Sequence, residues 1–178
     1  MKSTIDKIWI SCPISVPLAQ QAFKKYLECH FPQVDCWDRD SEYSGRGLDS
    51  SDAVVFMLPN NEFRYDVESL PVGLKSELKR ARDGGKKILI GYYRQTSKKW
   101  AVYDAKFTRK PMYRPAWGQT TMTNYIEGIE YSTKQVLMAA GRKGCDISGS
   151  VTVNNPEMLS IETTFKAGSF DRRLLLTL

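Results

Sequence analysis

Carboxylates are the side chains best suited to chemistry in this chain, and Glu77 stands out among them. The segment 69–93 predicts one helix followed by one buried strand, since Pro71 suits the first turn of a helix and a glycine pair ends it. On that helix Glu77 falls between Leu74 and Leu78, on the stripe that faces inward. A carboxylate there must be paired, protonated or placed at a cleft, because an isolated buried charge is costly.

Two interpretations of Glu77 are open at this point. In the first, it lies at the edge of the apolar stripe and pairs with Arg80 one turn further on, an interaction worth only about 0.2–0.5 kcal/mol. In the second, it is a catalytic or ligand-holding carboxylate at a helix beside the edge of a sheet.

Other common catalytic and metal-binding patterns are absent from the sequence. The single histidine, His30, ends a predicted helix with outward-facing lysines, so we expect it on the surface or in the last turn of that helix, and we expect no Ser-His-Asp triad. The four cysteines form no Cys-x-x-Cys motif, which favours reduced thiols over a structural zinc site. No GxGxxG or GxxxxGK[ST] pattern occurs, so neither a classical dinucleotide enzyme nor a P-loop nucleotidase is indicated. We therefore expect no metal and no cofactor.

The spacing of apolar residues in the first half predicts alternating strands and helices. Strands are expected at 7–12, 34–37, 52–58 and 88–93, with helices at 18–31 and 71–83. The almost wholly apolar run at 52–58 is typical of a central strand in a parallel sheet. The expected fold class is α/β, a Rossmann-like (flavodoxin-like) parallel sheet flanked by helices, followed by a C-terminal helix and a small antiparallel β meander.

Ligands of open α/β sheets bind beyond the carboxyl ends of the strands, which brings several loops to one rim. The candidate ligand-binding residues in these loops are Pro13, Ser15, Asp38, Asp40 and Asn60, with Asp66 a few residues after Asn60. Asp52 opens the third strand. The aspartates also have a plainer interpretation, because acidic loop residues usually cap turns and face water.

The second half of the chain is more basic than the first. Residues 98–178 hold twelve Lys and Arg against seven Asp and Glu, within a net charge of +6 for the 178 residues. The stretch 92–117 mixes these cations with Tyr and Trp, a composition suited to base stacking and phosphate contacts with nucleic acid. The alternative is that its aromatic residues are core and interface anchors, with the lysines outside.

Residues beyond 118 are expected to form one helix and a small sheet. A helix is predicted over 122–140, where Asn124 and Glu127 resemble a capping box. Alternation of apolar and polar residues predicts strands at 147–153, 159–165 and 174–178. We therefore divide the chain into a domain at 1–95 and a basic, aromatic α+β extension at 96–178. The extension packs on that domain or on a partner subunit, which favours a homo-oligomer.

The composition and the apolar runs of the sequence indicate which class of protein this is and where it is located. With 42% hydrophobic and 11% aromatic residues, the chain is globular rather than disordered. No run of about 18 apolar residues indicates a membrane span, and the first residues show no secretory signal. We expect a cytoplasmic protein with no membrane partner.

Three short motifs in residues 7–93 carry a resemblance to a known family. The first strand ends in a short proline turn, Ile8-Trp-Ile-Ser-Cys-Pro-Ile, and Ser51-Asp52-Ala53 opens an apolar strand. A helix then carries Gly73-Leu-Lys-Ser-Glu77-Leu. With these motifs the chain resembles the nucleoside 2-deoxyribosyltransferase-like group, which includes nucleoside monophosphate N-glycosidases and many small phage-borne relatives.

The resemblance implies roles for particular residues. In that family, a glutamate placed as Glu77 is here attacks or stabilises the anomeric carbon, and aspartates of the neighbouring strand and loop hold the sugar or base. Those aspartates correspond to Asp52 and Asp66, and Ser69 and Gly73 near the start of the helix join the ligand-binding residues. The implied activity is cleavage or transfer of an N-glycosidic bond in a nucleoside or nucleotide, without a cofactor.

Two other functions stay open on the sequence. One is a non-catalytic protein that binds or sequesters a nucleotide-derived ligand at the same rim. The other is a nucleic-acid-binding or assembly protein that uses the basic stretch 92–117, with the sheet as its scaffold. A fold by itself does not decide among these functions.

Overall fold

The computed structural model describes residues 5–13, 17–37, 43–130 and 133, and the fold is given for those residues. They contain seven strands, three α-helices and two short 3-10 helices. In chain order these are β1 (Lys7–Ser11), α1 (Pro17–Glu28), β2 (Gln33–Cys36), α2 (Arg46–Asp49), β3 (Ala53–Met57), η1 (Pro59–Asn61), β4 (Arg64–Asp66), η2 (Val67–Ser69), α3 (Val72–Asp83), β5 (Lys87–Arg94), β6 (Lys99–Arg114) and β7 (Gln119–Gly128).

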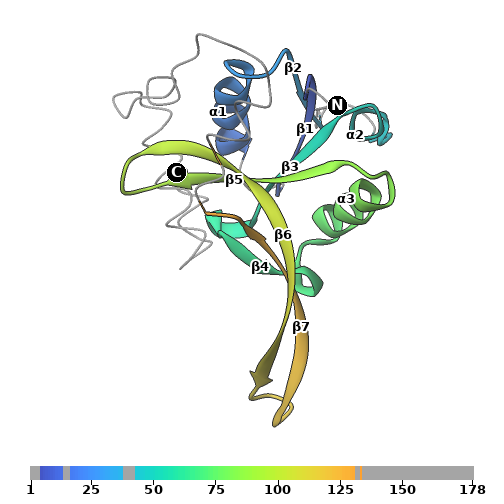
Figure 1. Ribbon diagram of the computed structural model, residues 1–178, viewed down its shortest axis with the longest axis vertical. Coiled ribbons are helices and arrows are strands. Elements are labelled where there is room, and N and C mark those ends of the chain that lie inside the picture. The colour runs from blue at the N-terminus through green and yellow to red at the C-terminus, as the bar shows by residue number, and fades with distance from the viewer. Residues whose placement is uncertain (1–4, 14–16, 38–42, 131–132, 134–178) are drawn as a thin grey trace.

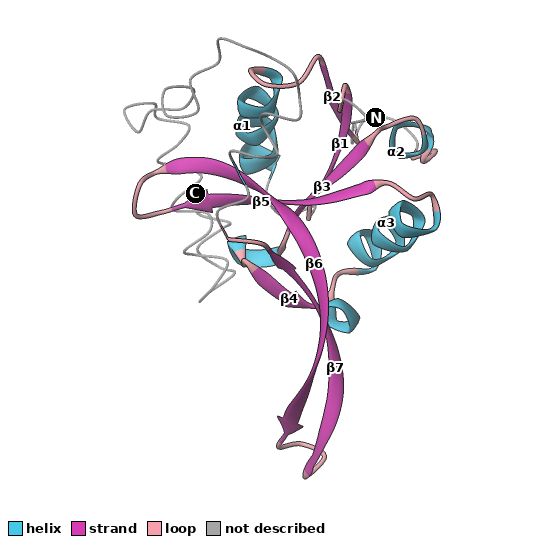
Figure 2. Cartoon of the chain, viewed as in Figure 1, coloured by secondary structure: helices cyan, strands magenta, loops and turns pink. Residues whose placement is uncertain are grey.

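The described strands form one mixed sheet in the order β2-β1-β3-β5-β6-β7-β4 (Figure 1; Figure 2). β1 lies parallel to β2 and β3, and β3 lies parallel to β5. The pairings β5–β6, β6–β7 and β7–β4 are antiparallel, and β6–β7 is the longest of all. The predicted fold class is therefore wrong. A helix-flanked, Rossmann-like parallel sheet does not describe a sheet in which half of the pairings are antiparallel.

The four strands predicted in the first half are confirmed individually as β1, β2, β3 and β5. All five residues of β3 are buried, and the strand is paired on both sides, as its apolar run indicates. Helices cover both faces at this position. α1 packs Phe23 and Leu27 on one face, and α3 packs Leu74 and Leu78 on the other. Figure 1 shows α1 and α3 on opposite sides of the sheet.

The helix predicted over 122–140 is wrong for its first seven residues, because β7 runs to Gly128. Threonines and Tyr125 dominate this segment, and such β-branched and aromatic residues favour a strand. The hairpin before it is closed by Gly118, whose φ of 62° suits glycine, and by the bond from Trp117 N–H to the Arg114 carbonyl (3.0 Å). The Asn124 and Glu127 pattern therefore has no helix to cap.

Several other expectations concern the second half of the chain. The predicted boundary at residue 95 falls in the turn between β5 and β6, which pair with each other in the sheet. The predicted strands at 147–153, 159–165 and 174–178, and most of the predicted helix, lie outside the described residues. Within the described part of the chain, no helix is both long and apolar enough to cross a membrane.

Gly91 tests how closely β5 and α1 approach each other. A Cβ at this position would lie 2.6 Å from both Cε1 and Cζ of Phe23, and 3.1 Å from Cγ1 of Val55. We expect Gly91→Ala to lower the free energy of unfolding by about 1–3 kcal/mol, because the core must shift to admit the methyl group. Urea unfolding measures this as a lower midpoint with an unchanged slope.

Gly73→Ala is the matched control, since a Cβ there meets nothing within 4 Å. Gly73 lies near the exposed start of α3, so alanine should leave stability unchanged or raise it by up to about 1 kcal/mol. Equal stability of Gly91→Ala and the wild-type protein would contradict the tight packing of β5 on α1.

Candidate functional site

Glu77 lies on the inward side of α3, among residues of the apolar core. Its neighbours on that stripe, Leu74, Leu78 and Ala81, are buried, whereas Glu77 itself is half-buried. Its Oε2 accepts a hydrogen bond of 2.9 Å from the indole Nε1–H of Trp9, which projects from β1. The carboxylate is therefore anchored to the central part of the sheet.

Two hydroxyl groups also approach the Glu77 carboxylate. Ser11 Oγ is buried and makes no hydrogen bond of regular geometry among the described residues, yet it lies close enough to influence Glu77. The Tyr43 hydroxyl, from the segment before α2, also lies close enough to influence Glu77. Trp9 and Ser11 point to the same face of β1 because they are two residues apart. A carboxylate, an indole and two hydroxyls thus meet near the carboxyl end of β1.

Burial governs the ionisation of this cluster. Desolvation raises the pKa of Glu77 above its ordinary value, and the hydrogen bond from Trp9, the nearby hydroxyls of Ser11 and Tyr43 and the charge of Arg80 oppose the shift. Desolvation also raises the pKa of Tyr43, and the neighbouring negative charge of Glu77 adds to this. Tyr43 therefore keeps its proton at neutral pH and can donate it in a hydrogen bond to the carboxylate.

Arg80 does not neutralise Glu77 by a direct ion pair. Its Nε and Nη2 bind the two carboxylate oxygens of Asp49 at 2.6 and 2.5 Å, in a two-pronged contact between α3 and α2. This contact lowers the pKa of Asp49 and raises that of Arg80. In the described part of the chain no ion pair reaches Glu77, so the interpretation of Glu77 as the partner of Arg80 is wrong.

The short helix α2 packs against Trp9 on the outer side of the site. A Cβ at Gly47 would lie only 2.2 Å from Cζ3 of Trp9, so glycine lets α2 sit directly on the indole ring. Tyr43, just before this helix, packs its ring edge-on against Trp37 with centroids 6.1 Å apart. Trp37 follows β2, so the segment after β2 supports Tyr43 beside the Glu77 cluster.

Asp52 lies at the other end of the strands. Its Oδ2 accepts hydrogen bonds from the backbone N–H groups of Asp6 (3.0 Å) and Lys7 (2.9 Å), where β1 begins. This is a structural contact that joins the amino ends of β1 and β3. The structure does not bring Asp52 to Glu77.

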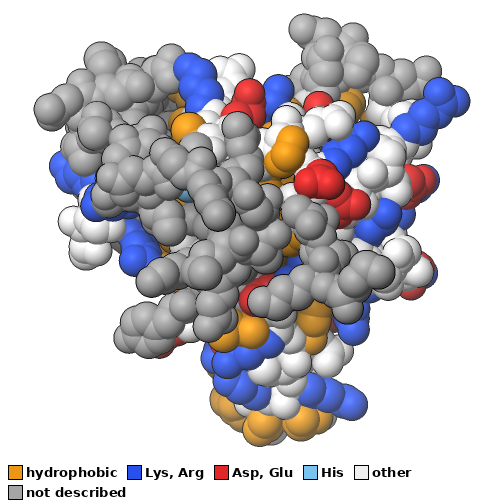
Figure 3. Space-filling model, turned by 45° about the horizontal axis from the view of Figure 1, so that its top comes forward, with side chains coloured by type: hydrophobic (Ala, Val, Ile, Leu, Met, Phe, Trp, Pro, Cys, Tyr) orange, Lys and Arg blue, Asp and Glu red, His pale blue; other side chains and the backbone are white. Residues whose placement is uncertain are grey.

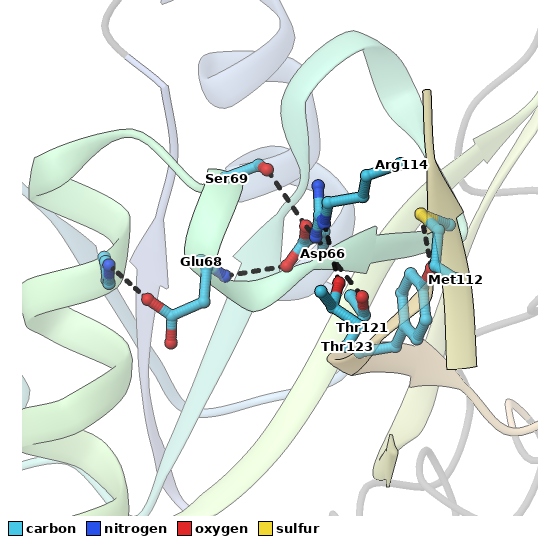
Figure 4. Close-up of polar contacts among 9 residues, drawn as sticks. Asp66, Glu68, Ser69, Met112, Arg114, Thr121 and Thr123 are labelled. Carbon is cyan, nitrogen blue, oxygen red and sulfur yellow. Dashed lines mark hydrogen bonds and ion pairs between the residues drawn. The ribbon is translucent and has the colours of Figure 1, made fainter. Parts of the chain in front are cut away.

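Asp66 and Ser69 do come together, but in a separate cluster (Figure 4). Asp66 accepts hydrogen bonds from the Glu68 N–H and the Ser69 hydroxyl, and it forms an ion pair of 3.1 Å with Arg114. Arg114 also donates to Thr121 and Thr123 of β7. Asp66 therefore ties η2 to the β6–β7 hairpin, and no described contact joins it to Glu77.

The remaining predicted ligand-binding residues are spread along the chain. Pro13 is buried just after β1, Asn60 is exposed in η1, and Gly73 is exposed on α3. Ser15, Asp38 and Asp40 lie outside the described residues. Next to Asn60, the amide of Asn61 binds the backbone N–H and C=O of Tyr93, which is a structural contact.

The structure also places the potential metal ligands, the cysteines and His30. Among the described residues, no group of three or more His, Cys, Asp or Glu side chains is placed to hold a metal ion. Cys12, Cys29 and Cys36 are half-buried thiols, and Cys145 lies outside the described residues. Of the two positions expected for His30, the turn at the end of the helix is confirmed, since the His30 backbone N–H bonds to the Leu27 carbonyl (2.9 Å). The surface position is wrong, because the residue is buried and packs edge-on against Tyr26.

Glu77→Gln tests the ionisation of the site. Because the pKa of Glu77 is raised above 4.5 by folding, the native state holds this proton more tightly than the unfolded chain does. The native state then binds more protons in the window just above that value, and the contribution of Glu77 to stability falls as the pH rises through it. Glutamine carries no charge, so the variant should gain stability relative to the wild type as the pH rises above about 4, the ordinary pKa of a glutamate.

Chemical unfolding of both proteins at several pH values measures this gain. Glu68→Gln is the control, because it also removes one negative charge but from a largely exposed side chain that pairs with Lys75. A constant difference between wild type and Glu77→Gln across the pH range would contradict the raised pKa.

Comparison of the chain with protein-family models, with curated proteins and with solved structures gave no match. Any functional conclusion must therefore rest on the chemistry of the residues themselves. The candidate site is the Glu77 cluster, with Trp9, Ser11 and Tyr43 in contact with the carboxylate.

Proposed function

We propose that this protein cleaves or transfers the N-glycosidic bond of a nucleoside or nucleotide, with Glu77 acting at the anomeric carbon. The observation that carries the proposal is a half-buried carboxylate without an ion-pair partner among the described residues, hydrogen-bonded to Trp9 and with the Tyr43 hydroxyl nearby. A helix-borne glutamate of this kind is also what the resemblance of residues 7–93 to deoxyribosyltransferase-like proteins implies.

The chemistry needs a carboxylate in a protected place. Breaking an N-glycosidic bond develops positive charge at C1′, and a nearby carboxylate stabilises that charge or forms a covalent bond to it. An ion pair would weaken both effects, because a bound cation would compete with the substrate for the carboxylate. Partial burial strengthens the interaction with C1′ through the lower local dielectric.

The covalent form of the reaction has two balanced steps. A carboxylate oxygen of Glu77 forms a bond to C1′ as the C1′–N bond breaks, and the electron pair leaves with the base nitrogen, which takes up a proton. Water, or a second base in a transfer reaction, then attacks C1′ and releases the carboxylate. When water attacks, the proton that it loses balances the proton taken up by the first base.

Trp9 and Tyr43 act in this proposal as positioning residues. The indole N–H fixes Oε2 of Glu77, and the Tyr43 hydroxyl limits rotation of the carboxylate. Both donors favour the ionised form that attack on C1′ requires, against the effect of burial.

A second candidate function is non-catalytic binding of a nucleotide-derived ligand. The observation that favours it is that no second carboxylate contacts Glu77 among the described residues, whereas glycosidases commonly use two. Asp52 and Asp66, the aspartates expected to help, are occupied in structural contacts elsewhere.

Base release decides between these functions. We would incubate the wild-type protein with a panel of nucleosides, deoxynucleotides and NAD, and follow free base by chromatography. Wild-type protein should release base from at least one compound, and Glu77→Gln should lower the rate by at least about 100-fold. Glu68→Gln, which alters an exposed carboxylate on η2, should retain the wild-type rate.

Circular dichroism and a thermal melt would establish that each variant is folded. Release that persists in folded Glu77→Gln would exclude Glu77 as the catalytic group. No release from any compound, together with thermal stabilisation by one of them, would support the binding function instead.

Two further expectations accompany the proposal. A cytoplasmic location and assembly into a homo-oligomer both stay predictions from the sequence. Light scattering during gel filtration measures the oligomeric state directly.

A further inference from the structure

The outer part of the β6–β7 hairpin projects beyond the body of the sheet (Figure 1). β6 pairs with β5 only over residues 99–104, and β4 pairs with β7 only over residues 125–127. From 108 to 124 the two strands pair with each other alone. A two-stranded ribbon buries little apolar surface and is only marginally stable by itself. Packing in a core therefore does not explain which side chains its outer part exposes.

The two faces of this ribbon differ. Residues directly opposite each other in an antiparallel pair share a face, and alternate residues point to opposite faces. One face, which we call the paired face, carries the cations Lys106, Lys110 and Arg114. The first two lie 3.6 and 3.9 Å from Glu127, and Arg114 binds Asp66. The cations of the paired face therefore have acidic partners within the same chain.

The other face, which we call the open face, has no such partners. It consists of Phe107, Arg109, Pro111 and Tyr113 of β6 with Thr120, Met122 and Asn124 of β7. Tyr113 is 61% exposed and Met122 50% exposed, and Trp117 in the adjoining turn is 64% exposed. Arg109 is exposed and forms no ion pair with any described residue. Arg82 of α3 stacks over Phe107 at the base of this face, 4.2 Å from the ring centroid.

The charge of the ribbon points to an anionic partner. Residues 105–126 contain four Lys and Arg and neither Asp nor Glu. In Figure 3 the end of the hairpin shows apolar side chains at the lower edge of the molecule with Lys and Arg beside them. Cations interleaved with exposed rings suit a polyanion that also offers flat apolar surfaces, and nucleic acid has both features.

The register of the ribbon adds a second argument. Arg109 and Asn124 lie directly opposite each other on the open face, so a guanidinium and an amide stand side by side. These groups bind base edges and phosphates, which a lipid headgroup or an acidic peptide offers only in part. Tyr113 and Trp117 can stack only on bases that are not already stacked in a duplex. The chemistry therefore favours a single strand over a double helix.

We propose that the β6–β7 ribbon is a binding arm for single-stranded nucleic acid. Arg109 of the open face contacts phosphates, and the rings of Tyr113 and Trp117 stack on bases. This proposal does not rest on Glu77 or on the proposed enzymatic activity.

Fluorescence anisotropy with labelled 20-nucleotide DNA and RNA strands, and with a duplex of the same sequence, tests the arm on the full-length protein. We expect binding to the single strands that is tighter than binding to the duplex and that weakens as salt rises. Tyr113→Leu and Trp117→Leu should each weaken it by about 5- to 100-fold, the usual effect of losing a stacking ring. Tyr113→Phe keeps the ring and should retain most of the affinity.

Arg109→Gln should weaken binding to all single strands alike and lower the slope of log K against log salt by about 0.7. Lys79→Gln removes an exposed cation from α3 instead and should bind as the wild type does. None of these variants touches the Glu77 cluster, so failure of the enzymatic proposal leaves this result intact.

Three outcomes would overturn the proposal. One is the absence of binding at low salt. Another is equal or tighter binding to the duplex with no effect of the leucine variants. The third is binding to vesicles of anionic phospholipid but not to oligonucleotides. All the variants change exposed side chains, so a thermal melt suffices to confirm that each is folded.

Discussion

The burial of β3 is the constraint on which the rest of this structure depends. Each of its five residues is buried, so the strand must be paired on both edges and covered on both faces. β1 and β5 supply the pairing, while α1 covers one face and α3 the other. The position of Glu77 follows from this arrangement, since the stripe of α3 that covers the sheet also carries the carboxylate. The hydrogen bond from Trp9 is what makes that position tolerable.

Local patterns predicted the parallel part of the sheet and failed for most of the antiparallel part. The strands β1, β3 and β5 are short apolar runs, and the helices between them have clear apolar stripes, so both could be recognised from neighbouring residues alone. β6 holds Pro111 and many charges, and its outer half lies in a two-stranded ribbon, where no core demands apolar residues. For β7, the prediction gave more weight to the capping-box pattern at Asn124 than to the strand preference of the threonines. A helix was therefore predicted where the structure has a strand.

The candidate site was predictable only in part. Helical spacing placed Glu77 inward. Trp9 and Ser11 lie in a predicted strand, but no motif in the sequence singled them out as neighbours of Glu77. Nothing in the sequence around Tyr43 indicated that it would reach the carboxylate, because α2 and the segment before it have no periodic pattern. Asp52 was misplaced for a geometric reason. A residue that opens a parallel strand lies at the amino end of the sheet, away from loops that follow the strands.

The length of β6 links the sheet to the ribbon. β5 without β6 would leave a long apolar strand with an open edge, which invites pairing with other chains. Residues 99–104 of β6 close that edge, and the strand then continues ten residues further. That continuation exposes Met112, Tyr113, Trp117 and Met122, although clustered apolar side chains in water promote aggregation. Edge protection needs only the first part of β6, so the exposed part is better explained by a surface that binds something. Because the two parts belong to one strand, that surface is continuous with the sheet on which α3, the helix of Glu77, packs.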